Sequence, residues 1–192
     1  MKVFYHASPI HCIEILEPRV SNHGEPRVYL SRKRENTLVY LSNAVEKYCR
    51  ETGFVHEGPW YKWGSYGFQN GLVRIDEYWP GALEETYKGV PGYIYAADEV
   101  PGMEEMKDIP DAVATSQPVP VLGCEYVPDA YEAILTAAEA GEILVRRYHE
   151  LPESMLAWID SCIKREYEEA RDIPTYRHFL EGKFPEITAA LE

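Results

Sequence analysis

Short strand-like segments, separated by helices and long loops, constrain the fold of this chain more than any other feature. Apolar or alternating runs over residues 2–5, 28–30, 72–78 and 118–127 predict strands. They do not alternate with helices in the regular way of βαβ units, and no G-x-G-x-x-G or P-loop sequence accompanies them. The pattern favours a single α+β domain over a doubly wound sheet.

The helical segments and two remaining strands complete this expected layout. We expect residues 1–150 to form the α+β core and residues 151–192 to add C-terminal helices that pack on the same domain. Further strands are expected at residues 93–96 and 143–148. The predicted helices cover residues 8–16, 36–51, 80–87, 129–140 and 152–170, and a peripheral helical tail follows from Pro174.

Three segments lack a regular period and are expected to be loops. Residues 18–26 are polar, and residues 98–118 are acidic and rich in proline. Residues 59–71 combine five aromatic side chains with three glycines. This aromatic segment is expected either to cover part of the core or to line a slot for a flat ligand.

Charge and composition exclude several classes of function. The net charge of −13 argues against general nucleic-acid binding, which needs a basic face. A small phosphate site stays open, because five basic residues between Arg19 and Arg34 face only Glu25. That basic cluster is expected to be either a solvated surface or a dock for a pyrophosphate or an acidic partner.

Targeting and metal-binding signals are absent from the sequence. Neither a long apolar run nor a basic-then-apolar leader is present, which predicts a cytoplasmic protein without a membrane partner. The four cysteines are scattered, and the histidines, His23 among them, have no zinc-ligand spacing. We therefore expect reduced cysteines and no metal site.

Two short motifs carry a chemical signal. Tyr5-His6-Ala7-Ser8 ends the first predicted strand, and Tyr29 lies in the second. The pair resembles the opening of the ADP-ribosyltransferase superfamily of the His-Tyr-Glu type, which includes poly- and mono-ADP-ribosylating enzymes and rifampin ADP-ribosyltransferase. The resemblance implies split antiparallel β-sheets flanked by helices, with NAD bound as a substrate between them.

The resemblance also implies roles for individual residues. His6 would hydrogen-bond a ribose hydroxyl, and the backbone of Ala7, where the family has glycine, would pair with the nicotinamide amide. Tyr29 would stack on nicotinamide. Thr37 and Tyr40 match a hydroxyl residue and a tyrosine that hold the other side of the ring, and their i, i+3 spacing places them on one helix face.

Ser8 and Arg32 complete the predicted NAD-binding set. Ser8 is also expected to cap the helix that Pro9 opens.

The third triad member should be an acid near the start of a late strand, and Glu125 is the closest match. Its carboxylate would stabilise the positive charge that develops on the ribose as the glycosidic bond breaks. Glu85, Asp98 and Glu99 are competing candidates. Glu125 could equally be a solvated strand residue, since Cys124 and Tyr126 alternate with it.

The expected function is NAD-dependent ADP-ribosyl transfer to an unknown protein or small-molecule acceptor, by a mono-ADP-ribosyltransferase or an NAD glycohydrolase. The alternative is an inactive module of the same type that binds NAD, ADP-ribose or a protein partner, and Ala7 keeps it open. A relative of RNA 2′-phosphotransferases would require a second histidine on the second strand. Tyr29 and the negative charge argue against that third interpretation.

Overall fold

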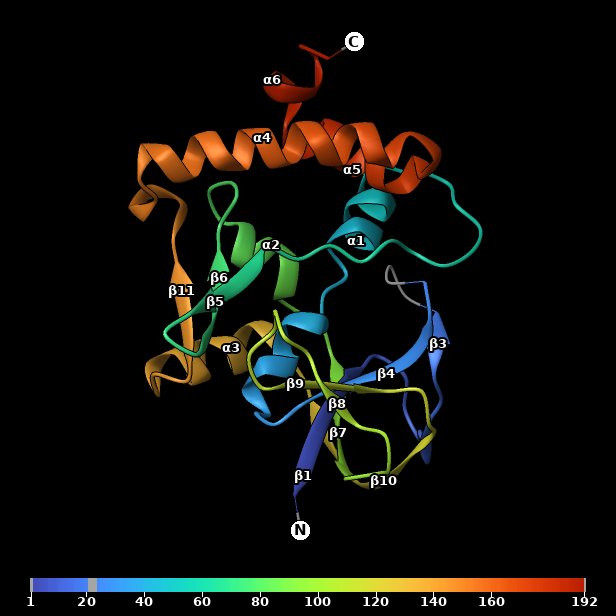
Figure 1. Cartoon of the computed structure of the whole chain (residues 1–192). Helices are drawn as coiled ribbons and strands as arrows, with labels where there is room; N and C mark the ends of the chain where they lie inside the picture. Colours follow the sequence, from blue (N-terminus) through green and yellow to red (C-terminus); the bar gives the residue numbers. More distant parts are fainter. Residues whose placement is uncertain (1, 21–23, 192) are drawn as a thin grey trace.

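The computed structural model describes residues 2–20 and 24–191, and its fold belongs to the α+β class. The sheets lie toward the N-terminal end, and the C-terminal helices cross the opposite end of the molecule (Figure 1). The α+β class and the single-domain expectation agree with this mixture of helices and mainly antiparallel sheets.

The larger sheet contains eight strands in the order β2-β10-β7-β1-β4-β9-β8, with β3 paired to β4. Every pairing in this sheet is antiparallel. The strands are β1 (Val3–Ser8), β2 (Ile15–Leu16), β3 (Arg19–Val20), β4 (Pro26–Ser31), β7 (Gly92–Asp98), β8 (Glu104–Glu105), β9 (Ala112–Thr115) and β10 (Val119–Val127).

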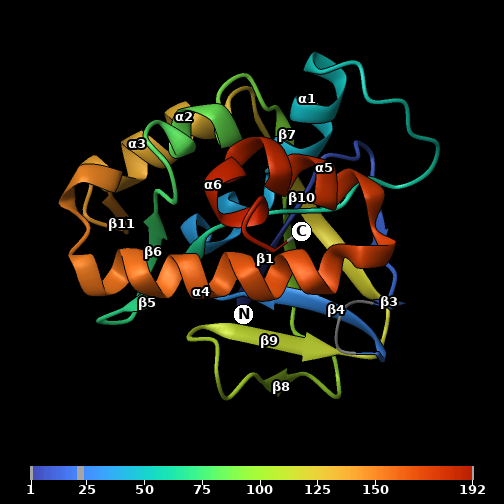
Figure 2. The ribbon, with the colours of Figure 1, turned by 90° about the horizontal axis from the view of Figure 1, so that it is seen from above.

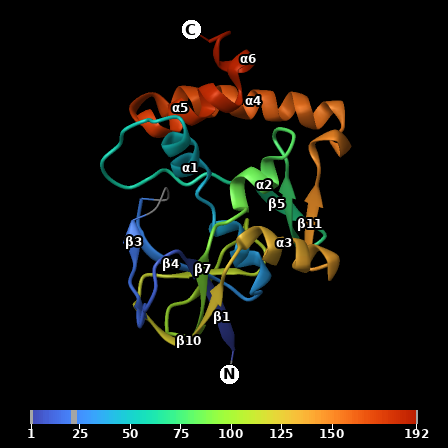
Figure 3. The same ribbon diagram turned by 180° about the vertical axis from the view of Figure 1, so that it is seen from behind.

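A smaller sheet of three strands has the order β11-β6-β5. Its strands are β5 (Tyr66–Gln69), β6 (Leu72–Asp76) and β11 (Ile143–Arg146). β5 pairs with β6 in antiparallel fashion, whereas β11 pairs with β6 in parallel. Parallel strands need a long connection, and the chain between β6 and β11 passes through the larger sheet before α3 (Ala130–Glu139) leads from β10 to β11 (Figure 3).

The remaining helices are η1 (Glu35–Tyr40), α1 (Ala44–Glu51), α2 (Ala82–Tyr87), η2 (Tyr148–Glu150), α4 (Glu153–Glu169), η3 (Ala170–Asp172), α5 (Pro174–Lys183) and α6 (Pro185–Thr188). Seen from above, α4 and α5 overlie the sheets (Figure 2). The helices predicted at 80–87, 129–140 and 152–170 are confirmed. Asp129 caps α3 by accepting hydrogen bonds from the backbone amides of Tyr131 and Glu132.

The continuous helix predicted over residues 36–51 is wrong. A 3₁₀ helix, η1, ends at Tyr40, and α1 begins at Ala44. Leu41 between them leaves the helical region, with φ −84° and ψ 50°, and its side chain is buried against Gly92. A Cβ at Gly92 would overlap Leu41 Cδ2, so a contact that is distant in sequence decides this break.

The helix predicted over residues 8–16 is also wrong. Ser8 ends β1, and its Oγ accepts a hydrogen bond from the Ile10 backbone amide at 3.1 Å, which closes a local turn instead of capping a helix. Ile10 is exposed, and Leu16 pairs with Val119 at the start of β10. Sheet pairing therefore determines the conformation of this segment.

Two predicted loops contain strands. The 98–118 segment forms β8 and β9, because Ala112–Thr115 is apolar enough to pair with β4 and bury Val113 and Ala114. The 18–26 segment contributes β3, which pairs with the start of β4. Asn22 and His23 lie outside the described residues.

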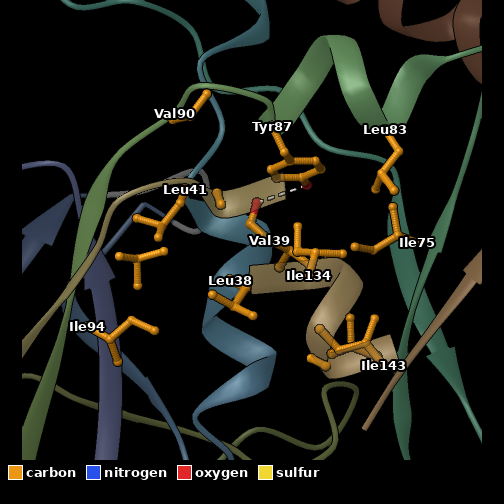
Figure 4. Packing of buried hydrophobic residues seen from close by; sticks show 14 residues of the cluster. Leu38, Val39, Leu41, Ile75, Leu83, Tyr87, Val90, Ile94, Ile134 and Ile143 are labelled. Carbon is orange, nitrogen blue, oxygen red and sulfur yellow. Dashed lines mark hydrogen bonds between the residues drawn. The ribbon is translucent and has the colours of Figure 1, made fainter. Parts of the chain in front are cut away.

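Three clusters of buried side chains make up the core. One joins η1, α2, α3 and both sheets, and Figure 4 shows its side chains around Leu38, Val39 and Ile134. A second lies inside the larger sheet around Phe4. The third joins α1 and the aromatic segment to α4 and α5. The prediction that the tail from Pro174 is peripheral is therefore wrong, because Phe179 and Leu180 are completely buried.

Candidate ligand-binding site

A cavity of about 470 Å³ lies where β1 and β4 face η1 and the aromatic segment. Its size is within the usual range for small-molecule sites. The start of β9 and the turn before it complete the wall with Met106, Ile109 and Ala112. Five of the residues predicted from sequence line this one cavity: His6, Ala7, Tyr29, Thr37 and Tyr40.

The cavity lies beside the point where β1 and β4 separate, and residues of both strands line it. Only Tyr5 and Ser31 oppose each other across the two strands, whereas β1 pairs with β7 along its full length. Beyond that point the His6 side chain spans the gap, and its Nδ1 lies 2.9 Å from the Tyr29 carbonyl oxygen. Since the carbonyl can only accept, Nδ1 carries the proton and Nε2 has the lone pair.

Burial keeps this imidazole neutral. Loss of solvent lowers the pKa of His6 and outweighs the opposing effect of the hydrogen bond to Tyr29, while the positive charge of Arg19 lowers it further. A neutral His6 with Nδ1 already bonded can offer Nε2 only as an acceptor. A ligand hydroxyl is the matching partner.

Thr37 and Tyr40 both line the cavity from η1, although the helix is 3₁₀ rather than α. With three residues per turn, side chains at i and i+3 lie directly above each other. The Thr37 hydroxyl donates to the Arg34 carbonyl at 2.6 Å, so it serves the helix. Tyr40 Oη accepts from Tyr66 Oη at 3.2 Å, and desolvation raises the pKa of Tyr40.

Aromatic rings from the 59–71 segment form the opposite wall. Trp63, Tyr66 and Phe68 line the cavity, and the Tyr66 ring meets the Tyr40 ring edge to face at a centroid distance of 5.6 Å. Part of the segment is β5 rather than loop, which holds Tyr66 and Phe68 in place. The predicted alternative in which these rings line a slot thus agrees with their position.

Asn36 is a polar lining residue that was not predicted from the sequence. It is 5% exposed, and neither Nδ2 nor Oδ1 has a hydrogen-bond partner among the described residues. A buried carboxamide without partners is costly and uncommon in native proteins. Its position directly before Thr37 was the signal available in the sequence.

Lys62 was also missed. Its Nζ donates to the Ser42 carbonyl at 3.0 Å beside the cavity, and it forms no ion pair with any described residue. Lys62 is exposed as a whole residue, but partial loss of solvent lowers its pKa, against a weaker raising effect of Glu46. Its place in the aromatic segment was the available signal.

Three predicted site residues lie outside the cavity lining. The Ser8 hydroxyl serves the turn to Ile10, and Arg32 pairs with Glu105 at 2.8 Å. Glu125 lies on β10, where Arg34 binds it through two hydrogen bonds of 2.9 and 2.5 Å. That bidentate contact lowers the pKa of Glu125 and keeps the carboxylate ionised.

The basic cluster seen in the sequence is largely neutralised by this arrangement. Arg32 pairs with Glu105, Arg34 pairs with Glu125, and Lys33 Nζ lies 2.9 Å from a carboxylate oxygen of Asp111. Lys33 also donates to the Gly71 carbonyl at 3.0 Å. These three cations therefore connect the start of η1 to neighbouring strands and turns.

Comparisons with protein-family models, curated proteins and solved structures gave no match for this chain. Within residues 2–20 and 24–191, no group of three His, Cys, Asp or Glu side chains could hold a metal ion. No helix in that part of the chain is long and apolar enough to cross a membrane.

Proposed function

We propose that this chain is an ADP-ribosyltransferase-like protein whose cavity binds the nicotinamide end of NAD. One observation carries the proposal: residues predicted from three separate segments, on β1, β4 and η1, line the same cavity. Tyr29 and Tyr40 supply aromatic rings to the lining, and His6 supplies an acceptor for a ribose hydroxyl. The divergence of β1 from β4 supports the split-sheet arrangement that the resemblance implies.

Binding is the role that the geometry supports best. Breaking the bond between nicotinamide and ribose requires a negative group beside the developing positive charge. No Asp or Glu lines the cavity among the described residues, and Glu125 is bound by Arg34. We therefore place the NAD-binding module ahead of the transferase.

ADP-ribosyl transfer to an unknown acceptor, or hydrolysis of NAD, is the second candidate. Glu125 and Ala7 both oppose Ile94 from the two sides of β7, so the carboxylate shares a row of the sheet with the predicted nicotinamide contact. Two strand spacings, about 10 Å, separate their backbones. Transfer would need Arg34 to release Glu125 toward the ligand.

The proposal is tested by titrating NAD into the protein in a calorimeter. Wild type should bind NAD, and Tyr40→Leu should weaken binding about tenfold because a stacking ring is lost. Tyr126→Leu is the matched control, since Tyr126 is an exposed tyrosine outside the cavity lining. Absence of NAD binding by a folded wild type would overturn the proposal.

Turnover is measured on the same samples by chromatography of released nicotinamide. Release by wild type and its loss in Glu125→Gln would establish a catalytic role, either transfer or hydrolysis. NAD binding without release would leave the binding module as the function.

A further inference from the structure

The charge of the cavity lining differs from that of the whole chain. Asp and Glu make up 32 of 192 residues, so about three of any 20 residues would be acidic at that composition. None of the 20 described lining residues is acidic. Lys62 contributes a positive charge to this lining, and His6 is kept neutral by burial. An otherwise acidic protein therefore offers a cavity suited to an anion.

Lys62 has hydrogen-bonding capacity left for a ligand. An ammonium has three N–H donors, and the hydrogen bond to the Ser42 carbonyl uses one of them. Ser42 is itself buried and donates its hydroxyl to the Trp63 carbonyl at 2.7 Å, so the carbonyl that holds Lys62 is fixed in place. The ammonium is thus positioned without an ion pair to any described residue, and Glu46, the carboxylate whose charge acts on its pKa, is itself paired with Arg50.

The neighbouring cations do not offer the same capacity. Arg32, Lys33 and Arg34 are each paired with an acid, and none of them lines the cavity. A phosphate in the cavity would have to displace a carboxylate to reach them. Lys62 can bind it without breaking an ion pair.

We propose that Lys62 binds a phosphate group of the cavity's ligand, so that the site selects an anionic nucleotide over a neutral ring or nucleoside. The inference rests on the proposed function and deepens it, because NAD joins a flat ring to a pyrophosphate. The aromatic wall accounts for the ring, and Lys62 accounts for the charge.

The test compares nicotinamide, NAD and ADP-ribose as probes, by calorimetry on wild type, Lys62→Met and Lys62→Arg. Lys62→Met should weaken NAD and ADP-ribose binding by about tenfold or more and leave nicotinamide affinity within about twofold. Lys62→Arg should retain most of the affinity. Lys164→Met is the control: it removes the same charge from α4, where Lys164 pairs with Asp160. Thermal melts verify that each variant folds.

The outcomes separate the two proposals. An unchanged NAD affinity in Lys62→Met, or an equal loss of nicotinamide and NAD affinity, would overturn the role of Lys62 and leave the nicotinamide pocket standing. A wild type that binds ADP-ribose but not nicotinamide would overturn the nicotinamide pocket, and Lys62→Met would then decide the phosphate contact alone. A wild type that binds none of the probes would overturn both.

Discussion

Replacing Asn36 with leucine should stabilise the free protein, which is unusual for a buried position. The side chain is 5% exposed, and both polar atoms of its amide lack partners among the described residues. Leaving a buried polar group unsatisfied costs about 1–3 kcal/mol. Leucine has the same branching and the same number of side-chain heavy atoms but no polar atom, and the cavity beside position 36 has room for its bulkier methyl groups. We therefore expect the free energy of unfolding to rise by about 1–3 kcal/mol.

Thermal unfolding followed by circular dichroism measures this change. For a chain of this size, 1 kcal/mol shifts Tm by about 2–4 °C, so the gain is readily detected. Thr86→Val is a matched control, because the Thr86 hydroxyl is also buried without a partner but lies outside the cavity. It should stabilise too. A lower Tm for Asn36→Leu, with a higher Tm for Thr86→Val, would show that the Asn36 amide is satisfied and that its burial carries no such cost.

Three further predictions follow from individual contacts. Lowering the pH below about 6.5 should reduce the free energy of unfolding, because the pKa of His6 is lowered in the folded state. As the pH falls, His6 is therefore protonated in the unfolded chain before it is protonated in the folded one. His6→Gln should flatten this pH dependence in thermal melts. Gly182→Ala should lower the free energy of unfolding in denaturant titrations, because the new Cβ would overlap the Tyr48 phenol. Helix propensity alone predicts the opposite, a gain of about 1 kcal/mol. Tyr48→Ala should then lower the free energy of unfolding less in the Gly182→Ala background than in the wild type. Raising the pH toward 10 should weaken NAD binding sooner in wild type than in Lys62→Arg, since the pKa of Lys62 is lowered; identical calorimetric pH profiles would contradict this.

Local patterns in the sequence were sufficient where neighbouring residues decide the structure. The alternation in residues 72–78 predicted β6, and Asp129 and Gly141 marked the two ends of the α3 region. The α+β class followed from such segments. His6 and Tyr29 were recognised from short motifs, and the structure places both at one cavity.

Contacts distant in sequence account for the predictions that were wrong. The break after Tyr40 depends on Gly92, and the strand at Ile15–Leu16 depends on β10. The spacing of apolar residues within 36–51 and 8–16 contains no information about those distant partners. The C-terminal tail is a further example, because α5 is buried through contacts with α1, the aromatic segment and α4.

The candidate site illustrates the same limit. Asn36 is distinguished by its burial, and Lys62 by the absence of acidic side chains from the described cavity lining. Arg32 and Glu125 matched expected residue types, but ion pairs with Glu105 and Arg34 hold them elsewhere. Pairing of charges across a fold depends on tertiary geometry, which residue spacing does not specify.

A crystal structure of the protein with NAD would show directly whether this cavity binds the dinucleotide. We expect the nicotinamide ring between Tyr29 and Tyr40, with a ribose hydroxyl at His6 Nε2 and a phosphate oxygen at Lys62 Nζ. NAD bound away from this cavity, or an empty cavity at saturating NAD, would contradict this expectation.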